Sequence, residues 1–390
     1  MPRTLLALAL LFPAVAAAAE PAAPSAIKFK KTQLDAKFRS EGVAVGDYNH
    51  DGKLDIAAGS VYYAAPDWKM VNVQEKAQEY DPLRYSNSFC CWADDLNADG
   101  WTDLIVVDFP GTPTWWFENP REPGGVWKQH LCTPVTNNES PNYLDVDGDG
   151  IREFVMGVAP DSKNSDGPDR QMAIVRRPSA AGRPWHVDTI SAKEAPGTKR
   201  YSHGLGIGDV NRDGRNDVVV PQGWWESPDS KGVGEWTFHA APLGQDCAHM
   251  HVFDFDGDGD NDVLSSAAHR VGIWHHERTA DGWKTHEIEN SFTQTHAMCA
   301  ADINRDGLPD FVTGKRYWAH GPKGDINPGD PAVLYWFELG RKDGKAVWTP
   351  HQIDNDSGVG TQFEVADVNA DGKLDIAISN KKGVYYFEQQ

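Results

Sequence analysis

The sequence predicts an all-β fold, a seven-bladed β-propeller closed by an N-terminal strand that completes the last blade. The first observation is one acidic loop pattern, Asp-x-Asn/Asp-x-Asp-Gly-x-x-Asp/Glu, that occurs seven times. Its starts are Asp47, Asp95, Asp145, Asp209, Asp254, Asp302 and Asp367. They are 45 to 65 residues apart, the length of a four-stranded blade. The second observation is that the last repeat lacks a strand that the N-terminus can supply.

The N-terminus reads as an export signal. Arg3 gives a charged start, residues 5–15 form a short apolar stretch, and residues 17–19 are the small alanines of a cleavage site. We therefore expect a signal peptide over 1–19, a linker over 20–25 and the propeller over 26–390. The mature protein should be exported, periplasmic or extracellular, and the apolar stretch is too short to span a membrane.

Each repeat contains four strand-like runs. In the fourth repeat, small and apolar residues 204–208 precede the acidic loop, and the β-branched run 218–220 follows it. An aromatic strand comes next at 224–226, and the last strand carries Trp-x-x-His as Trp236 and His239. Turn residues separate these runs, which is the pattern of an antiparallel four-stranded blade.

The two ends of the chain predict how the ring closes. The seventh repeat stops after its aromatic strand and has no fourth strand. Residues 29–35 match 348–354, the fourth strand of the sixth repeat, in spacing and residue type. The N-terminal segment should therefore be the outer strand of the last blade, which leaves no exposed sheet edge at the closure.

The acidic loops predict up to seven calcium sites. Positions 1, 3 and 5 place oxygen side chains on one side of a turn, Gly at position 6 permits the turn, and an acid at position 9 closes the shell. Calcium takes six to eight such oxygens. The predicted ligands are Asp47, Asn49, Asp51, Asp55, Asp95, Asn97, Asp99, Asp103, Asp145, Asp147, Asp149, Glu153, Asp209, Asn211, Asp213, Asp217, Asp254, Asp256, Asp258, Asp262, Asp302, Asn304, Asp306, Asp310, Asp367, Asn369, Asp371 and Asp375.

The charge agrees with cation binding. The formal net charge is −20, which argues against nucleic acid or an anionic membrane surface as a partner. Seven divalent ions would reduce it to about −6. An EF-hand is excluded because no helices flank the loops and position 12 is not a recurring Glu. A single loop of this kind could be a plain Asp-rich turn, but seven in register indicate structural ions.

Five cysteines are an odd number for an exported chain, so at least one has no disulfide partner. Cys132 could bridge to Cys90 or Cys91, which lie near one end of the same blade. Cys247 and Cys299 fall on neighbouring inner strands and could form a bridge or remain buried thiols. The sequence leaves these alternatives open.

The repeats resemble the FG-GAP/VCBS repeats of integrin α-subunit propellers and of many exported bacterial proteins. The resemblance covers essentially the whole mature chain. It implies a seven-bladed ring with calcium in the loop between the first two strands of each blade. It implies no particular activity.

Candidate chemistry lies at the axial mouth opposite the calcium loops, where the inner strands begin. His203, His249 and His296 precede the inner strands of three consecutive blades. We expect them to converge as ligands of one zinc or other transition metal, or as a base. The sixth-blade insertion 315–325 projects to the same face, and we expect four of its residues to grip substrate: Lys315, Arg316, Tyr317 and His320. The competing interpretation is that the histidines only fill the channel mouth.

A second, weaker resemblance links HGLGIGDVNRDG, GWWESP, TGKRYWAHGPKGD and DNDSGVGTQ to exported propellers related to the propeller domain of aldos-2-ulose dehydratase. That family eliminates water from keto sugars, and other propellers of similar construction are polysaccharide lyases. The resemblance implies elimination chemistry on a carbohydrate, with histidine as base and a lysine, arginine or metal holding the developing enolate.

The sequence therefore supports two functions. The first is a carbohydrate-acting lyase or dehydratase at the axial mouth, a carbon–oxygen lyase if it is an enzyme. The second is a non-catalytic module that binds a glycan or a protein. A scaffold without a small ligand is the third alternative. The substrate, the oligomeric state and the identity of any axial metal do not follow from the sequence.

Overall fold

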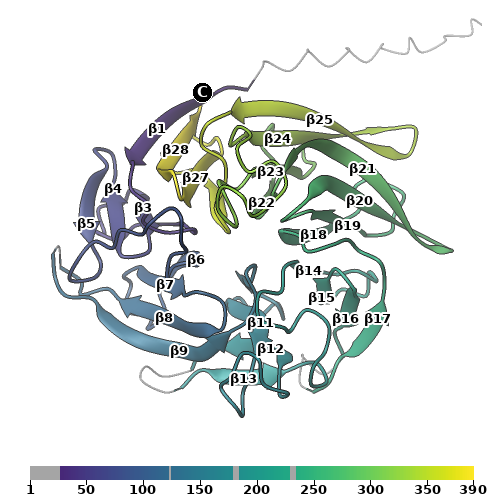
Figure 1. Ribbon diagram of the computed structural model, residues 1–390, viewed down its shortest axis with the longest axis horizontal. Coiled ribbons are helices and arrows are strands. Elements are labelled where there is room, and N and C mark those ends of the chain that lie inside the picture. Colours follow the sequence, from purple (N-terminus) through teal and green to yellow (C-terminus); the bar gives the residue numbers. More distant parts are fainter. Residues whose placement is uncertain (1–26, 123, 179–183, 229–233) are drawn as a thin grey trace, which may run out of the picture.

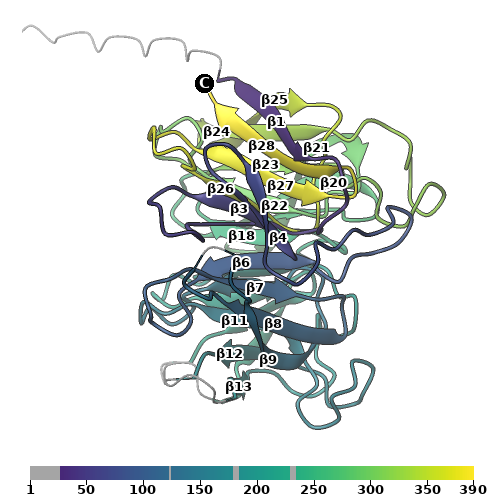
Figure 2. The ribbon, with the colours of Figure 1, turned by 90° about the vertical axis from the view of Figure 1, so that its left-hand side faces the viewer.

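The computed structural model describes residues 27–122, 124–178, 184–228 and 234–390, and these contain 28 β-strands and no α-helix. The predicted signal peptide and the predicted linker lie outside the described residues. Short antiparallel meanders follow one another around a common centre (Figure 1), with the side view in Figure 2. The all-β propeller is therefore confirmed. None of the described residues forms a helix long and apolar enough to cross a membrane.

Five of the sheets have four strands each. The first is β2 (Ala44–Gly46), β3 (Asp55–Ala58), β4 (Val61–Ala64) and β5 (Lys69–Asn72). The second is β6 (Cys90–Asp94), β7 (Asp103–Val107), β8 (Thr112–Glu118) and β9 (Lys128–Thr136). The third is β10 (Asn142–Leu144), β11 (Glu153–Val158), β12 (Gln171–Arg176) and β13 (His186–Thr189). Another is β22 (Met298–Ala301), β23 (Asp310–Gly314), β24 (Leu334–Lys342) and β25 (Lys345–Asp354).

The closing sheet joins the two ends of the chain. It contains β26 (Phe363–Ala366), β27 (Asp375–Asn380), β28 (Gly383–Gln389) and β1 (Phe29–Asp35). Strand β1 pairs antiparallel with β28 in a register from Phe29 opposite Gln389 to Gln33 opposite Tyr385. Figure 1 shows the two strands side by side at the start and end of the colour scale. The predicted closure by the N-terminal strand is confirmed.

The prediction of seven blades is confirmed only in part, because two of the repeats share one sheet. The fourth and fifth repeats form a single eight-stranded sheet. It contains β17 (Thr237–Ala240), β16 (Gly223–Glu226), β15 (Asp217–Val220), β14 (Leu205–Gly208), β18 (His249–Phe253), β19 (Asp262–Ser266), β20 (Val271–Thr279) and β21 (Gly282–Thr293).

Glycines explain this fusion. The inner strands β14 and β18 pair in parallel, with Gly206 opposite Met250. A Cβ at Gly206 would lie 2.5 Å from the Met250 carbonyl oxygen, and one at Gly208 would lie 2.5 Å from Cβ of Val252. Because neither glycine has a side chain, the two inner strands approach to hydrogen-bonding distance. The repeat pattern contains no signal for this pairing.

The core lies between neighbouring sheets. One cluster packs Ile56 of β3, Val312 of β23 and Ile376 of β27, all fully buried, and a second packs Ile105 of β7 against Phe154 of β11. All five cysteines are free thiols, so neither disulfide that the sequence left open forms. Hydrophobic packing between sheets, rather than covalent crosslinks, therefore holds these blades together.

Candidate functional site

The seven acidic loops connect the first and second strands of each four-stranded repeat and share one hydrogen-bond pattern. In every loop the acid at position 9 is buried and accepts the backbone N–H of position 2, as Asp55 does from Tyr48 at 3.1 Å. The acid at position 1 accepts backbone N–H groups later in the loop, as Asp47 does from Asp51 and Gly52. Backbone donors therefore organise each loop around inward-facing carboxylates.

The electrostatics of these loops suit a cation. Burial raises the pKa of Asp103 and of Asp310 to about 7, and the other carboxylates of each loop add to this effect. In two loops, three carboxylates each offer an oxygen within 4.8 Å of the others: Asp145, Asp147 and Glu153, and Asp254, Asp256 and Asp262. Oxygen-only donor sets of this kind fit a hard divalent ion, and calcium remains a proposal.

Three histidines meet at the opposite end of the inner strands. His203 precedes β14, His296 precedes β22, and His269 lies in the loop between β19 and β20. Each offers one ring nitrogen within 4.8 Å of those of the other two. Nε2 of His203 is 3.2 Å from Nε2 of His269, and the ring centroids of His269 and His296 are 4.8 Å apart. We call these three residues the histidine centre.

Polar groups fix the outer side of two of these imidazoles. Nδ1 of His203 lies 2.7 Å from the carbonyl oxygen of Tyr201, and Nδ1 of His296 lies 3.3 Å from that of Gln294. Because a carbonyl only accepts, Nδ1 of each ring carries the proton. The Nε2 atoms are then left for the centre of the cluster, and Nε2 of buried His296 has no hydrogen-bond partner. Metal-bound histidines are held in this way.

His269 differs from the other two, because its buried Nδ1 makes no hydrogen bond and only lies within ion-pair distance of Asp325. Nδ1 of His269 is 3.3 Å from Oδ1 of Asp325, whose carboxylate also lies 3.0 Å from Nδ1 of His320. Burial opposes ionisation of Asp325, but the two histidines outweigh it and hold its pKa well below the ordinary value. The His320 side chain is 46% exposed. Its Nε2 is therefore available to a molecule at the mouth.

Charged residues surround the histidine centre. Oε2 of Glu139 lies 3.3 Å from Nε2 of His203 and 3.5 Å from Nη1 of Arg316. Arg316, only 2% exposed, also pairs with Glu41. Burial would raise the pKa of Glu139, but His203 and Arg316 outweigh it and lower that pKa to about 2. The centre thus has an ionised carboxylate directly beside it.

The protonation of the centre follows from these neighbours. Burial lowers the pKa of His203, but Glu139 reverses this effect and raises the pKa above its ordinary value. Burial, and then Arg316, hold the pKa of His296 well below its ordinary value. A proton on Nε2 of His203 would face both Oε2 of Glu139 and Nε2 of His269. A divalent ion would replace this proton, because neutral imidazoles bind metals.

The structure separates the other predicted residues from this centre. His249 begins β18, and its Nε2 lies 3.2 Å from the Pro141 carbonyl oxygen. It also lines a pocket of about 410 Å³ between the inner strands. Burial, with His251 nearby, lowers its pKa to about 4. The buried Lys315 ammonium donates to the carbonyls of Pro328 and Asp330. Tyr317 is half-buried, and the ammonium of Lys382 lies over its ring.

Sequence reasoning missed His269, Glu139 and Glu41 because none belongs to the repeated motif. A signal did exist for His269. His269 follows the second strand of its blade. In the next two blades, Lys315 and Lys381 follow the second strand in the same way. Charged side chains at the end of consecutive second strands point to the axial mouth, since those strands run back toward it. Glu139 and Glu41 precede inner strands and could have been found in the same way as His203.

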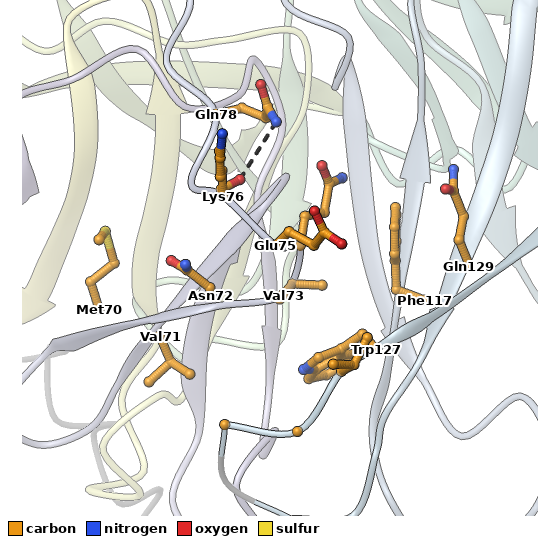
Figure 3. A pocket seen from close by; sticks show the side chains of 14 residues that line it. Met70, Val71, Asn72, Val73, Glu75, Lys76, Gln78, Phe117, Trp127 and Gln129 are labelled. Atoms are coloured by element: carbon orange, nitrogen blue, oxygen red, sulfur yellow. Dashed lines mark hydrogen bonds between the residues drawn. The ribbon is translucent and has the colours of Figure 1, made fainter.

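A groove with a larger volume than the pocket beside His249 lies elsewhere. Figure 3 shows the residues that line it, among them Met70 and Val71 of β5, Phe117 of β8 and Trp127. Its volume is about 930 Å³. Its lining holds no histidine, and its only charged residues are Glu75 and Lys76. The volume of a groove therefore does not identify the candidate site in this protein. The convergence of titratable side chains at the histidine centre identifies it.

Comparison with known proteins identifies the repeat. A family model described as an FG-GAP-like repeat matches residues 95–156 and 228–313. These two stretches of the chain are similar to FG-GAP-like repeats. The two matched stretches contain four of the seven acidic loops, those starting at Asp95, Asp145, Asp254 and Asp302. The predicted resemblance to this type of propeller is confirmed.

Several solved structures are similar to this chain at low identity. An Agrocybe aegerita lectin, described as recognising non-reducing terminal N-acetylglucosamine, is 15% identical with a TM-score of 0.44 over 85% of this chain and 82% of its own. An exotype rhamnogalacturonan lyase is 14% identical with a TM-score of 0.45, over 94% and 75%. A Bacillus licheniformis rhamnogalacturonan lyase is 12% identical with a TM-score of 0.44, over 93% and 75%. Among curated proteins, none matches the chain.

Proposed function

We propose that this chain is an exported, calcium-stabilised propeller that acts on a carbohydrate as a lyase or dehydratase, with the histidine centre as its site. The observation that carries the proposal is the convergence of three imidazoles, two of which have Nδ1 hydrogen-bonded to a backbone carbonyl on the outer side. Polar filling of a channel would need no such convergence, because each ring could pair with a backbone carbonyl as His249 does.

His203, His269 and His296 would hold one borderline divalent ion, zinc being the type that three neutral imidazoles suit. When bound, such an ion polarises a carbonyl or carboxylate oxygen of the substrate. Glu139 supplies negative charge beside the ion and Arg316 keeps that carboxylate in place. Lys315 is not part of this arrangement, since its ammonium serves the loop at Pro328.

The residue best placed to move a proton is His320. Its Nδ1 faces the ionised Asp325, so Nδ1 carries the proton and the exposed Nε2 presents a lone pair. An Asp–His pair of this kind can abstract a proton near neutral pH. It lies beside the histidine centre, because the rings of His269 and His320 are 4.6 Å apart. Abstraction next to a polarised carbonyl, followed by loss of an oxygen substituent, is an elimination.

The carbohydrate class rests on the resemblance of segments 313–325 and 354–362 to sugar-eliminating propellers and on the aromatic residues at the mouth. Tyr85 and Tyr317 are half-buried and Tyr201 is 43% exposed. Aromatic faces of this kind stack on the C–H face of a sugar ring. A lyase and a lectin use such surfaces alike, so a glycan-binding module without catalysis is the alternative.

The test is an elimination assay on keto sugars and on uronic-acid oligosaccharides, followed by the ultraviolet absorbance of the new conjugated double bond. His320→Gln should lower kcat by about 100- to 10,000-fold and leave KM little changed, the usual effect of removing a general base. His351→Gln is the matched control, since this histidine bonds Glu338 on an outer strand. Full turnover in His320→Gln would contradict the proposed base. Sugar binding without turnover in the wild-type protein would favour the lectin-like alternative.

A further inference from the structure

Three aromatic side chains from three different loops form a continuous surface at the mouth. Tyr85 lies before β6, Phe109 lies between β7 and β8, and Tyr201 lies before β14. The ring centroids of Tyr85 and Phe109 are 5.4 Å apart, and those of Phe109 and Tyr201 are 5.7 Å apart. We call these residues the aromatic wall. It adjoins the proposed base, because the rings of Tyr85 and His320 are 6.5 Å apart.

Three cations lie over the aromatic wall. The Lys381 ammonium is 4.5 Å from the Tyr85 ring centroid, and the Arg316 guanidinium is 6.0 Å from it. The guanidinium of Arg200 lies over two rings, 4.7 Å from Tyr201 and 5.7 Å from Phe109. Stacking on aromatic faces orients these cations. Arg316 and Lys381 are buried and Arg200 is half-buried, so Arg200 is the most accessible of the three.

Two of the three cations already have polar partners. Arg316 is paired with Glu41 and Glu139. The Lys381 ammonium is buried, donates to the carbonyl of Trp318 at 3.1 Å, and has its pKa lowered to about 8, chiefly by burial and then by Arg316.

Arg200 differs from both. Its Nε donates to the Pro110 carbonyl at 2.8 Å, which fixes the plane of the guanidinium. Across the parts of the chain that the structure describes, no carboxylate lies within ion-pair distance of it. Arg200 is half-buried against Gly111 and Ser165, so the side chain is held in place while its two Nη groups have no carboxylate to bind. A fixed guanidinium with free Nη donors is suited to bind a carboxylate through two hydrogen bonds.

We propose that Arg200 binds the carboxylate of an acidic sugar whose ring stacks on the aromatic wall, so that the substrate class is uronic-acid-containing carbohydrate. This inference rests on the proposed function for placing a sugar at the mouth. The peptide segment that carries Arg200 also carries His203. The backbone carbonyl of Tyr201, which lies between them, accepts a hydrogen bond from Nδ1 of His203. The carboxylate site and the histidine centre are therefore fixed to the same short segment.

Such a substrate completes the elimination chemistry. Neutralising the carboxylate makes the neighbouring C–H more acidic. The C–H bond breaks with its proton passing to Nε2 of His320, its electron pair forms a carbon–carbon double bond, and the adjacent carbon–oxygen bond breaks. The leaving oxygen takes a proton from water or from the protonated histidine. No oxidant or reductant is needed.

The test compares binding of a uronic-acid oligosaccharide with binding of its methyl ester, which has the same sugar rings without the charge. Calorimetry on the wild-type protein should show the acid bound about 10- to 100-fold more tightly than the ester, the usual effect of a charge-assisted hydrogen bond. Arg200→Gln should abolish this preference while ester affinity is kept. Lys199→Gln, which removes the neighbouring exposed charge, should retain the preference.

Equal wild-type affinity for acid and ester, or binding of neither, would overturn the inference. So would an equal loss of preference in Lys199→Gln, because the effect would then be general attraction. If Arg200→Gln loses ester binding through misfolding, Arg200→Lys replaces it. This variant keeps the charge but lacks the two Nη donors of the guanidinium, so it should lose part of the preference for the acid. An unchanged preference in this variant would overturn the inference. Acid binding without elimination would defeat only the proposed function, and elimination from neutral keto sugars without acid preference would defeat only this inference.

Discussion

Oε2 of Glu139 lies 3.3 Å from Nε2 of His203, and the same nitrogen lies 3.2 Å from Nε2 of His269. One imidazole nitrogen thus faces a carboxylate and a second imidazole, while its own Nδ1 is fixed by a backbone carbonyl. Because Nδ1 already carries a proton, Nε2 carries one only in the charged form of the ring, which Glu139 favours by raising the pKa of His203. A metal ion placed there would meet two ring nitrogens and a negative charge. Glu139 is therefore as important to the proposed site as the histidines.

A transition metal should depend on the histidine centre and not on the channel histidine. His296→Ala removes a buried Nε2 without any partner, so we expect about one transition metal per chain in the wild type and none in this variant. His249→Ala is the matched control, because His249 bonds a carbonyl away from the centre. Elemental analysis of protein purified without chelator measures both. Unchanged calcium content shows that the variants are folded, and equal metal content in all three proteins would contradict the site.

Glu139→Gln should weaken binding of this metal about 10- to 100-fold, the usual loss when a partner of a metal centre is removed. The amide keeps the size of the side chain but removes the charge beside His203. Glu118→Gln is the control, since Glu118 also pairs with a histidine, His130, but on an outer strand. Competition titration against a chromophoric chelator gives the affinities. Identical affinities of the two variants would show that Glu139 has no role at the centre.

Without calcium, stability should fall as pH rises from about 4 to about 7. Burial, with neighbouring acids adding to it, raises the pKa of Asp103 and Asp310 to about 7 and of Asp217 to about 6, above the value of 3.8 in an unfolded chain. In this window the folded protein holds protons that the unfolded chain has released, so raising the pH favours unfolding.

The measurement is thermal unfolding in chelator at about pH 5 and about pH 7.5, repeated with calcium. The melting temperature should be lower at the higher pH in chelator, and calcium should remove the difference, since the ion replaces the protons. Asp103→Asn provides the matched variant, because it cannot titrate and should reduce the pH dependence. A melting temperature in chelator that rises with pH would show that the loop acids do not control stability.

Gly206→Ala should destabilise the protein by about 1–3 kcal/mol, the usual cost of overpacking. Its Cβ would lie 2.5 Å from the Met250 carbonyl oxygen and would force β14 away from β18. Gly340→Ala in β24 is the control, because the nearest atom to its Cβ is 3.7 Å away, and its effect should stay within about 0.5 kcal/mol. Urea unfolding in excess calcium compares the two. Equal stability of both variants would mean that the pairing of β14 with β18 contributes little.

Much of the architecture could be predicted because it is repeated. The spacing of Asp47 and Asp95, the loop glycines and the aromatic strands each recur, so an error in one repeat is corrected by the others. The match between residues 29–35 and 348–354 located the closing strand for the same reason. The pairing of β14 with β18 was missed, because it depends on two glycines in one repeat and on the partner that they admit.

The candidate site was predictable only in part. His203 and His296 could be placed at the mouth because they precede inner strands, and the structure brings their rings to 5.4 Å. His249 occupies a similar place in sequence, yet it begins the fused strand β18 and bonds the Pro141 carbonyl. The parallel pairing holds the start of β18 against β14, which is consistent with the separation of His249 from the centre. His269 takes the third position from a loop that carries no repeat signature.

The sequence alone determined the all-β class, the repeat, the acidic loops and the closing strand, because these follow from local spacing and from residue types that each blade shares. Only the tertiary structure decided which side chains meet at the axis. Glu41, Glu139, His269 and Arg316 come from four different blades, and their distances depend on how the ring closes and on how far each loop reaches inward. Local sequence patterns do not predict such contacts, because each contact depends on the packing of several sheets at once.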